Sequence, residues 1–202
     1  MIARSLLLAL SSALLVTACA SGPPDQVPDA CLILEDNRSW GRDLRRTERR
    51  WGVSPGTQLA ILKRESSFNR NARPARKRLL LILPGPRPSS AFGYAQALDS
   101  TWDWYREDTG RRGADRNDFG DAVDFVGWYS SMSQRQSGIA LDDPYNLYLA
   151  YHEGHGGYNR GSHRGKSWLH RAARQVESDA RRYDAQISQC EARLGRRWIP
   201  FL

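Results

Sequence analysis

Apolar residues recur along this chain at helical spacing, in segments separated by glycine, proline and small polar residues. This pattern predicts a mainly α-helical protein, because residues three and four positions apart share one face of a helix. Ser54 followed by Pro55 is a typical helix start, Asp99 is expected to cap another helix, and Asp143 with Pro144 opens a further one. The predicted helices cover residues 37–51, 54–66, 99–108, 118–136, 143–154 and 167–193.

Residues 76–88 interrupt the helical pattern with a short apolar run that ends at Pro84-Gly85-Pro86. Such a turn signal predicts a small loop or hairpin insert. Its apolar residues are expected either to join the core as a buried strand, which is the interpretation we prefer, or to form a flap over a cleft or a membrane.

Glu65 is the most informative residue, because it is an acid at a position that disfavours acids. It falls in the last turn of the predicted helix 54–66 and shares a face with Ile61 and Leu62, so its side chain is expected to point inward. Burial and the negative end of the helix dipole both raise the pKa of such a carboxyl, which lets it donate a proton near neutral pH. The alternative is a solvated Glu paired with Arg70 or Arg73.

The N-terminal segment is typical of an exported lipoprotein. Residues 1–18 combine an early Arg with a short apolar run, which predicts a signal peptide that is too short to span a bilayer. Val16-Thr17-Ala18-Cys19 resembles the bacterial lipobox, in which the Cys is acylated; an ordinary cleavage site beside a Cys is the alternative. Residues 19–30 would then be a lipidated Cys and a Pro-rich tether, and residues 31–202 a single domain.

Cys31 and Cys190 are the remaining cysteines, and they stand near the two ends of the predicted domain. In an oxidising compartment outside the cytoplasm they are expected to form a structural disulfide. In the chain-entropy model, a bridge that closes so long a loop stabilises the fold by roughly 5 kcal/mol.

The formal net charge is +8 and comes almost entirely from arginine. A basic protein outside the cytoplasm meets anionic cell wall and lipid, and planar guanidinium groups bind carboxylates and phosphates well. The chain carries no nucleic-acid-binding motif, so nucleic acid is not an expected partner.

Three separated stretches resemble the motifs of one enzyme family. Residues 65–69 (ESSFN) resemble the E-S-x-F motif of the lytic transglycosylases of the soluble, goose-type-lysozyme-like kind. Residues 91–96 (AFGYAQ) are similar to the A-x-G-x-x-Q element of that family, and residues 150–154 (AYHEG) are similar to its A-Y-N-x-G element, followed by residues 156–159 (GGYN). His152 stands where Asn is usual and Glu153 where a small residue is usual, and the insert lengthens the spacing between Glu65 and the second motif.

This resemblance implies a lysozyme-like fold and cleavage of the glycan between N-acetylmuramic acid and N-acetylglucosamine. It makes Glu65 the catalytic acid/base, Gln96 a substrate-contacting amide and Tyr151 a hydroxyl that orients the acid or the sugar. Further substrate-binding candidates are Glu153, Tyr158 and Asn159. The structural alternatives are that Tyr151 belongs to the core, that Gln96 stabilises its loop and that Glu153 caps the helix or pairs with Arg160.

Glu65 has no acidic neighbour immediately downstream, because residues 66–98 contain neither Asp nor Glu. Glycosidases that hydrolyse their substrate need a second carboxylate. Its absence from this segment favours a non-hydrolytic reaction that leaves 1,6-anhydromuramoyl ends. A muramidase that uses Glu153 or Asp99 as the partner is the alternative.

Two other functions are compatible with the sequence. One is a zinc-dependent wall hydrolase that uses His152, His155 and His163, although the spacing is one residue short of H-E-x-x-H and glycines interrupt the helix there. The other is a non-enzymatic lipoprotein that tethers the outer membrane to the wall.

The expectation is a lyase without metal or cofactor that binds peptidoglycan glycan strands. We expect it to act as a monomer, held by its lipid anchor in the bacterial cell envelope at the outer membrane, facing the periplasm.

Overall fold

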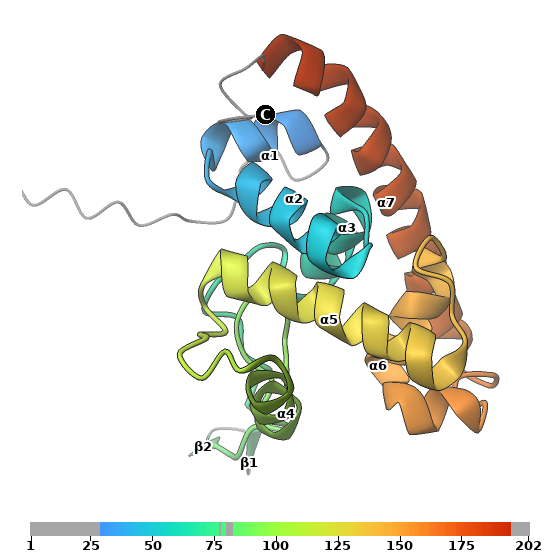
Figure 1. Ribbon diagram of the computed structural model, residues 1–202. Helices are drawn as coiled ribbons and strands as arrows, with labels where there is room; N and C mark the ends of the chain where they lie inside the picture. The colour runs from blue at the N-terminus through green and yellow to red at the C-terminus, as the bar shows by residue number, and fades with distance from the viewer. Residues whose placement is uncertain (1–28, 77, 80–82, 195–202) are drawn as a thin grey trace, which may run out of the picture.

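The computed structural model describes residues 29–76, 78–79 and 83–194, and they form a mainly helical domain, as predicted (Figure 1). The signal segment, Cys19 and most of the tether lie outside the described residues. No helix in the described ranges is both long and apolar enough to cross a bilayer. The elements are α1 (Ala30–Asp36), α2 (Trp40–Trp51), α3 (Pro55–Ser66), β1 (Arg78–Leu79), β2 (Leu83–Pro84), α4 (Asp99–Thr109), α5 (Phe119–Ser137), α6 (Pro144–Asn159) and α7 (Ser167–Leu194).

Helix α3 lies at the centre of the core, and every residue from 55 to 62 is buried. It begins as the sequence predicts, with the Ser54 hydroxyl accepting from the Thr57 amide at 3.2 Å and Pro55 in the first turn. The long helix α7 packs along α3, as Figure 1 shows. The two backbones come so close that a Cβ on Gly56 would lie 2.3 Å from the Ala180 carbonyl oxygen. Only glycine fits at this crossing.

Polar contacts fix the register between α3 and α7 at both ends of their interface. The Gly56 amide donates to Asp184 Oδ1 at 2.6 Å, and Ser54 donates to Asp184 Oδ2 at 2.7 Å. One helical turn before the end of α3, Lys63 pairs with the buried Asp179 at 2.7 Å. The position of the last turn of α3 is therefore set by α7.

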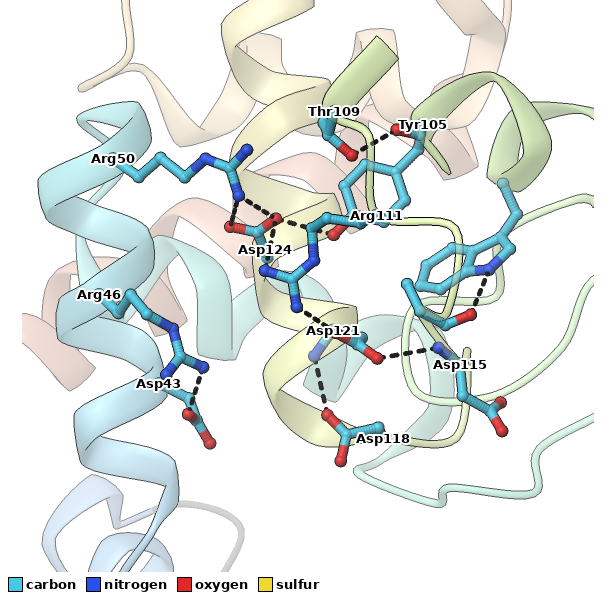
Figure 2. A network of polar contacts seen from close by, with 12 residues as sticks. Asp43, Arg46, Arg50, Tyr105, Thr109, Arg111, Asp115, Asp118, Asp121 and Asp124 are labelled. Carbon is cyan, nitrogen blue, oxygen red and sulfur yellow. Dashed lines mark hydrogen bonds and ion pairs between the residues drawn. The ribbon is translucent and has the colours of Figure 1, made fainter. Parts of the chain in front are cut away.

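A buried carboxylate joins α2, α4 and α5 (Figure 2). Asp124 on α5 has a side chain that is 2% exposed, and it accepts from Arg50 at 3.1 Å, from Trp51 Nε1 at 3.0 Å and from the Tyr105 hydroxyl at 2.7 Å. Arg111 completes the set at 3.5 Å. A buried charge is tolerated only when it is compensated in this way, so the network specifies how these helices meet.

The predicted disulfide is confirmed: Cys31 and Cys190 are bonded, with their Cα atoms 6.0 Å apart. The bridge attaches α1 to the end of α7. Helix α1 itself was not predicted, because a short helix offers too few turns for a period to show. Asp29 caps it by accepting from the Cys31 and Leu32 amides.

The predicted cap of α4 is wrong. Leu98 precedes α4 without a side-chain cap, and Asp99 lies inside the first turn, where it pairs with Arg116 at 2.7 Å. At Gly154 the helix is interrupted, as predicted, because this glycine has a non-helical φ of 70°. The prediction missed the second helical segment of α6, which continues beyond this kink to Asn159.

The predicted hairpin is present in the insert. Strands β1 and β2 form a two-stranded antiparallel sheet, with Arg78 opposite Pro84 and Leu79 opposite Leu83. Whether its apolar residues join the core as a buried strand lies outside what the described residues show. Residue 77 and residues 80–82 lie outside the described ranges.

We predict that Asp124→Ala lowers the free energy of unfolding by about 3 kcal/mol, because it leaves the donors of Arg50, Trp51 and the buried Tyr105 without their acceptor. Urea denaturation followed by circular dichroism measures the change. Asp103→Ala is the matched control. Its side chain is 64% exposed, so its loss should change stability by less than about 0.5 kcal/mol. Equal effects of the two substitutions would contradict the structural role of the network.

Candidate active site

Glu65 lies in the last turn of α3 and is half-buried. Burial raises the pKa of its carboxyl to about 7, although a hydrogen bond from Tyr148 and the charge of Arg64 act in the opposite direction. At neutral pH this group is therefore divided between its acid and its carboxylate. That balance suits a group that must first donate and then accept a proton.

The chain turns sharply after Glu65. Ser67 and Phe68 both have positive φ values, 50° and 61°, which are unfavourable for residues with a Cβ. The Ser67 amide closes α3 by donating to the Lys63 carbonyl at 2.9 Å. Phe68 is 1% exposed and packs against Trp40 with ring centroids 5.8 Å apart. The buried ring anchors the turn that follows the acid.

Tyrosines of α5 and α6 surround the acid. Tyr148 and Tyr151 stand one turn apart on α6, and the pKa values of both hydroxyls are raised, first by burial and then by the charge of Glu65. Tyr129 of α5 packs edge-on against Tyr151 at 5.3 Å, and burial raises its pKa to about 12. All three hydroxyls therefore stay protonated and act as hydrogen-bond donors, not as bases.

The Tyr151 hydroxyl donates to the Ala95 carbonyl at 2.5 Å and so joins α6 to the loop of residues 91–97. Gly93 lets this loop approach the backbone at Arg116 closely. Its φ is +77°, and a Cβ there would lie 2.1 Å from the Arg116 carbonyl oxygen. The second and third motifs of the sequence thus meet in space.

Gln96 braces its own loop. Its side-chain amide nitrogen donates to the Ala72 carbonyl at 3.0 Å and to the Gly93 carbonyl at 2.9 Å. Both amide protons are used in this way, so only Oε1 is left to contact a substrate. The stabilising role that the sequence allowed as an alternative is the one these contacts describe.

A cavity of about 220 Å³ begins beside these tyrosines. Tyr151 connects it to the acid, because this residue lines the cavity and is also influenced by the charge of Glu65. Its wall also includes residues of the loop before α4, of α4 and of α6: Gln96, Leu98, Thr101, His152 and Glu153. Its mixed apolar and polar lining is typical of a ligand site.

Glu153 lines the cavity as an ionised carboxylate. Burial alone would raise its pKa, but hydrogen bonds from Lys166, Ser162 and His152 outweigh burial and lower the pKa to about 2. Lys166 binds it at 2.7 Å, so the pairing with Arg160 considered from the sequence is wrong. A carboxylate held in this way is a poor proton acceptor.

Tyr158 and Asn159 are not brought into the cavity. Both follow the kink at Gly154 and make structural contacts instead. The Tyr158 hydroxyl donates to Asn146 Oδ1 at 2.9 Å, and the Asn159 amide donates to the Gln136 carbonyl at 3.0 Å. The extra helical segment beyond the kink directs them away.

The histidines have separate partners. His155 is buried, stacks on Tyr129 at 4.4 Å and contacts the Ser133 hydroxyl. His163 stacks on Tyr158, whereas His152 meets Trp168. Within the described part of the chain no group of three or more His, Cys, Asp or Glu residues could hold a metal ion. The residues proposed for zinc therefore do not fit a zinc site.

A larger cavity, of about 460 Å³, opens beside α4 and is lined by residues that include Asp99, Asp103 and Arg116. The side chains of Asp99 and Asp103 are both 64% exposed. Solvated carboxylates of this kind lack the burial that makes Glu65 an acid, so the smaller cavity is the better candidate for chemistry.

The sequence analysis did not identify Tyr148, Tyr129 or Lys166 as residues of the site. A signal for Tyr148 was present, because its position one turn before Tyr151 puts both rings on one helix face. The ion pair of Lys166 with Glu153 could not be predicted, because the two residues lie 13 positions apart and the fold brings them together.

Comparison with known proteins agrees with this geometry. A family model described as "Transglycosylase SLT domain" matches residues 7–190. Curated proteins show no match to the chain.

The raised pKa of Glu65 predicts a stability effect that does not depend on activity. The folded protein holds this proton up to about pH 7, whereas a carboxyl with the reference pKa of 4.5 releases it earlier. The stabilisation that the proton provides is complete below about pH 4.5 and is lost as the pH rises to 7. Because glutamine does not titrate, Glu65→Gln should become more stable than the parent across this window, by on the order of 2 kcal/mol above pH 7.

Urea denaturation at several pH values tests this, with Glu177→Gln on α7 as the matched control. Glu177 only forms a surface pair with Arg181. A difference between Glu65→Gln and the parent that is the same at pH 4.5 and pH 8 would refute the raised pKa.

Proposed function

Since the chain belongs to the transglycosylase SLT domain family, whose members act on peptidoglycan in the bacterial envelope, we propose that it is a peptidoglycan lytic transglycosylase. It cleaves the bond between N-acetylmuramic acid and N-acetylglucosamine, with Glu65 as the single acid/base. The observation that carries this proposal is a carboxyl with a pKa near 7 at the end of a buried helix, whose charge acts on Tyr151, a residue that lines a cavity.

In the first step the neutral Glu65 carboxyl donates its proton to the glycosidic oxygen as the bond to the muramic C1 breaks. Positive charge then spreads over C1 and the ring oxygen in an oxocarbenium-like transition state. The Glu65 carboxylate that remains lies close to this charge. Its burial strengthens the attraction, because water screens it less.

Glu153 is the only carboxylate among the described residues that line the cavity, and the other acids considered as partners are engaged elsewhere, which supports a reaction without a second carboxylate. Residues 66–98 contain no acid. Glu153 is held by Lys166 at a pKa of about 2, and Asp99 is exposed and paired with Arg116. Asp124 and Asp179 are used in structural ion pairs.

The cationic centre is therefore captured from within the substrate. The N-acetyl carbonyl oxygen of the muramic residue bonds to C1, and the Glu65 carboxylate then removes the proton of the C6 hydroxyl. The C6 oxygen attacks C1 and displaces the N-acetyl oxygen. The product is a 1,6-anhydro ring, Glu65 is protonated again, and no water is consumed.

The tyrosines keep this site in place. Tyr151 holds the loop of residues 91–97 beside α6 through the Ala95 carbonyl, and Tyr148 donates to Glu65. Gln96 is left with Oε1 to accept from a sugar hydroxyl or amide. In the reaction, Glu65 is the only one of these groups that exchanges a proton.

We extend the proposal to location. The lipobox-like residues 16–19 support acylation of Cys19 and attachment to the outer membrane, facing the periplasm. Several acyl chains on one residue give stable anchoring, whereas one chain does not. The enzyme would then act as a monomer on wall within reach of its tether.

We predict that Glu65→Gln lowers the rate of sacculus cleavage by a factor of about 10²–10⁴, because it removes the titrating proton and keeps the size of the side chain. Release of soluble muropeptides from purified sacculi measures the rate. Glu177→Gln should cleave at the parent rate. The parent rate should also fall as the pH rises above about 7, because the required acid form is lost. Near-normal cleavage by Glu65→Gln would place the chemistry elsewhere.

We predict that the products carry 1,6-anhydromuramoyl ends, which are one water lighter than hydrolytic ends and cannot be reduced by borohydride. Mass spectra of digested sacculi, before and after borohydride treatment, distinguish the two. Mainly reducing muramic ends would show a hydrolase, and Glu153→Gln and Asp99→Asn would then test the two acids considered as partners.

A further inference from the structure

Trp168, the second residue of α7, is an exposed aromatic residue at a position where the fold gives it little to pack against. Its relative exposure is 47%, whereas Trp40, Trp102 and Trp128 are buried. Trp51 and Trp104 are partly buried and pack against the core. Among the tryptophans that the structure describes, Trp168 alone is exposed, with close to half of its surface in contact with solvent. No hydrophobic burial explains it.

Its position relates it to the cavity beside Glu65. Trp168 packs edge-to-face with His152, with ring centroids 5.0 Å apart and an interplanar angle of 78°, and His152 lines that cavity. Leu98, the residue that precedes α4, is 43% exposed and lines the same cavity. Large exposed apolar groups beside a cavity with polar neighbours are typical of ligand-binding surfaces.

Polar contacts hold the support of this ring in place. His152 Nδ1 lies 3.1 Å from Glu153 Oε1, and Lys166 binds the same carboxylate at 2.7 Å. Ser162 donates to the other oxygen of Glu153. Because Glu153 stays ionised with a pKa of about 2, these contacts persist across the neutral range. His152 is thereby oriented, and Trp168 rests against an oriented ring.

An edge-to-face contact with one neighbour leaves an indole face open. The face of an aromatic ring carries negative charge density and attracts polarised C–H groups. The C–H groups on one side of a pyranose ring form such a surface, while its hydroxyl and N-acetyl groups point outward. A tryptophan also immobilises few rotatable bonds on binding, which keeps the entropic cost low.

We propose that Trp168 is a sugar-stacking platform that extends the cavity into a longer glycan-binding site. The ring binds the apolar face of an N-acetylhexosamine of the strand next to the cavity wall at His152. This rests on the proposed function only in that the ligand is the peptidoglycan glycan. The residue does not take part in proton transfer.

The test measures binding in the Glu65→Gln background, so that the ligand is not consumed. The ligand is glycan strands from sacculi from which an amidase has removed the stem peptides, and isothermal titration gives the affinity. Trp168→Ala should weaken binding about three- to tenfold, since an aromatic contact of this kind contributes about that factor. Trp168→Phe keeps a π face and should recover most of the loss.

Leu32→Ala is the matched control, because Leu32 is similarly exposed, at 38%, and lies on α1. It should bind the strands as the parent does. Thermal unfolding of each variant verifies the fold, which removal of an exposed ring should leave intact. Unchanged affinity of Trp168→Ala overturns the proposal, as does an equal loss in Leu32→Ala or a parent that does not bind the strands.

Failure of the proposed chemistry would look different. Reducing ends in the digest, or cleavage by Glu65→Gln, would contradict the lyase mechanism while leaving the effect of Trp168 on strand affinity unchanged.

Discussion

The burial of α3 is the constraint on which the rest of the structure depends. A helix that is covered on all sides can hold the acid of its last turn out of water, which a surface helix cannot do. This requires α7 to lie against α3, and Gly56 removes the only side chain that would prevent it. The contacts of Asp184 with Gly56 and of Asp179 with Lys63 then fix the position of the last turn of α3 relative to α7. The raised pKa of Glu65 is thus a consequence of packing along the whole helix.

Buried carboxylates in this protein have two kinds of environment, which differ in whether a cationic side chain binds the carboxylate. Asp124 and Glu153 each receive cationic donors, from Arg50 and from Lys166. Glu65 instead receives its hydrogen bond from the uncharged hydroxyl of Tyr148. At Glu65 desolvation therefore outweighs the groups that lower its pKa, whereas at Glu153 the hydrogen bonds outweigh desolvation. The ion-paired environment stabilises the fold, whereas the desolvated environment of Glu65 raises the pKa of its carboxyl, so that it can donate a proton.

Local signals in the sequence were enough to predict the long helices, the Cys31–Cys190 bridge and the inward direction of Glu65, because each depends on spacing along one segment or on compartment. The contacts of Gln96, Tyr158 and Asn159 with Ala72, Asn146 and Gln136 could not be predicted, because each joins parts of the chain that lie 12 or more residues apart. For Tyr158 and Asn159 the kink at Gly154 is the physical reason, since the helical segment beyond it takes a direction that periodicity does not reveal. The motif pattern brings Tyr151 close to the site, but only the fold shows that its hydroxyl serves the loop of residues 91–97.

The insert that lengthens the spacing between the first and second motifs does not displace the site, and the contacts at its base explain why. The Gly93 amide donates to the Ala72 carbonyl at 3.0 Å, and the Gln96 side chain binds the same carbonyl. Residues 73–92 therefore form a loop whose two ends are held together, and the hairpin of β1 and β2 lies within this loop. Lengthening such a closed loop adds little entropic cost, because that cost grows only with the logarithm of loop length. The second motif keeps its place because Ala72, Arg116 and Tyr151 hydrogen-bond its backbone, independently of how many residues the chain uses to arrive there.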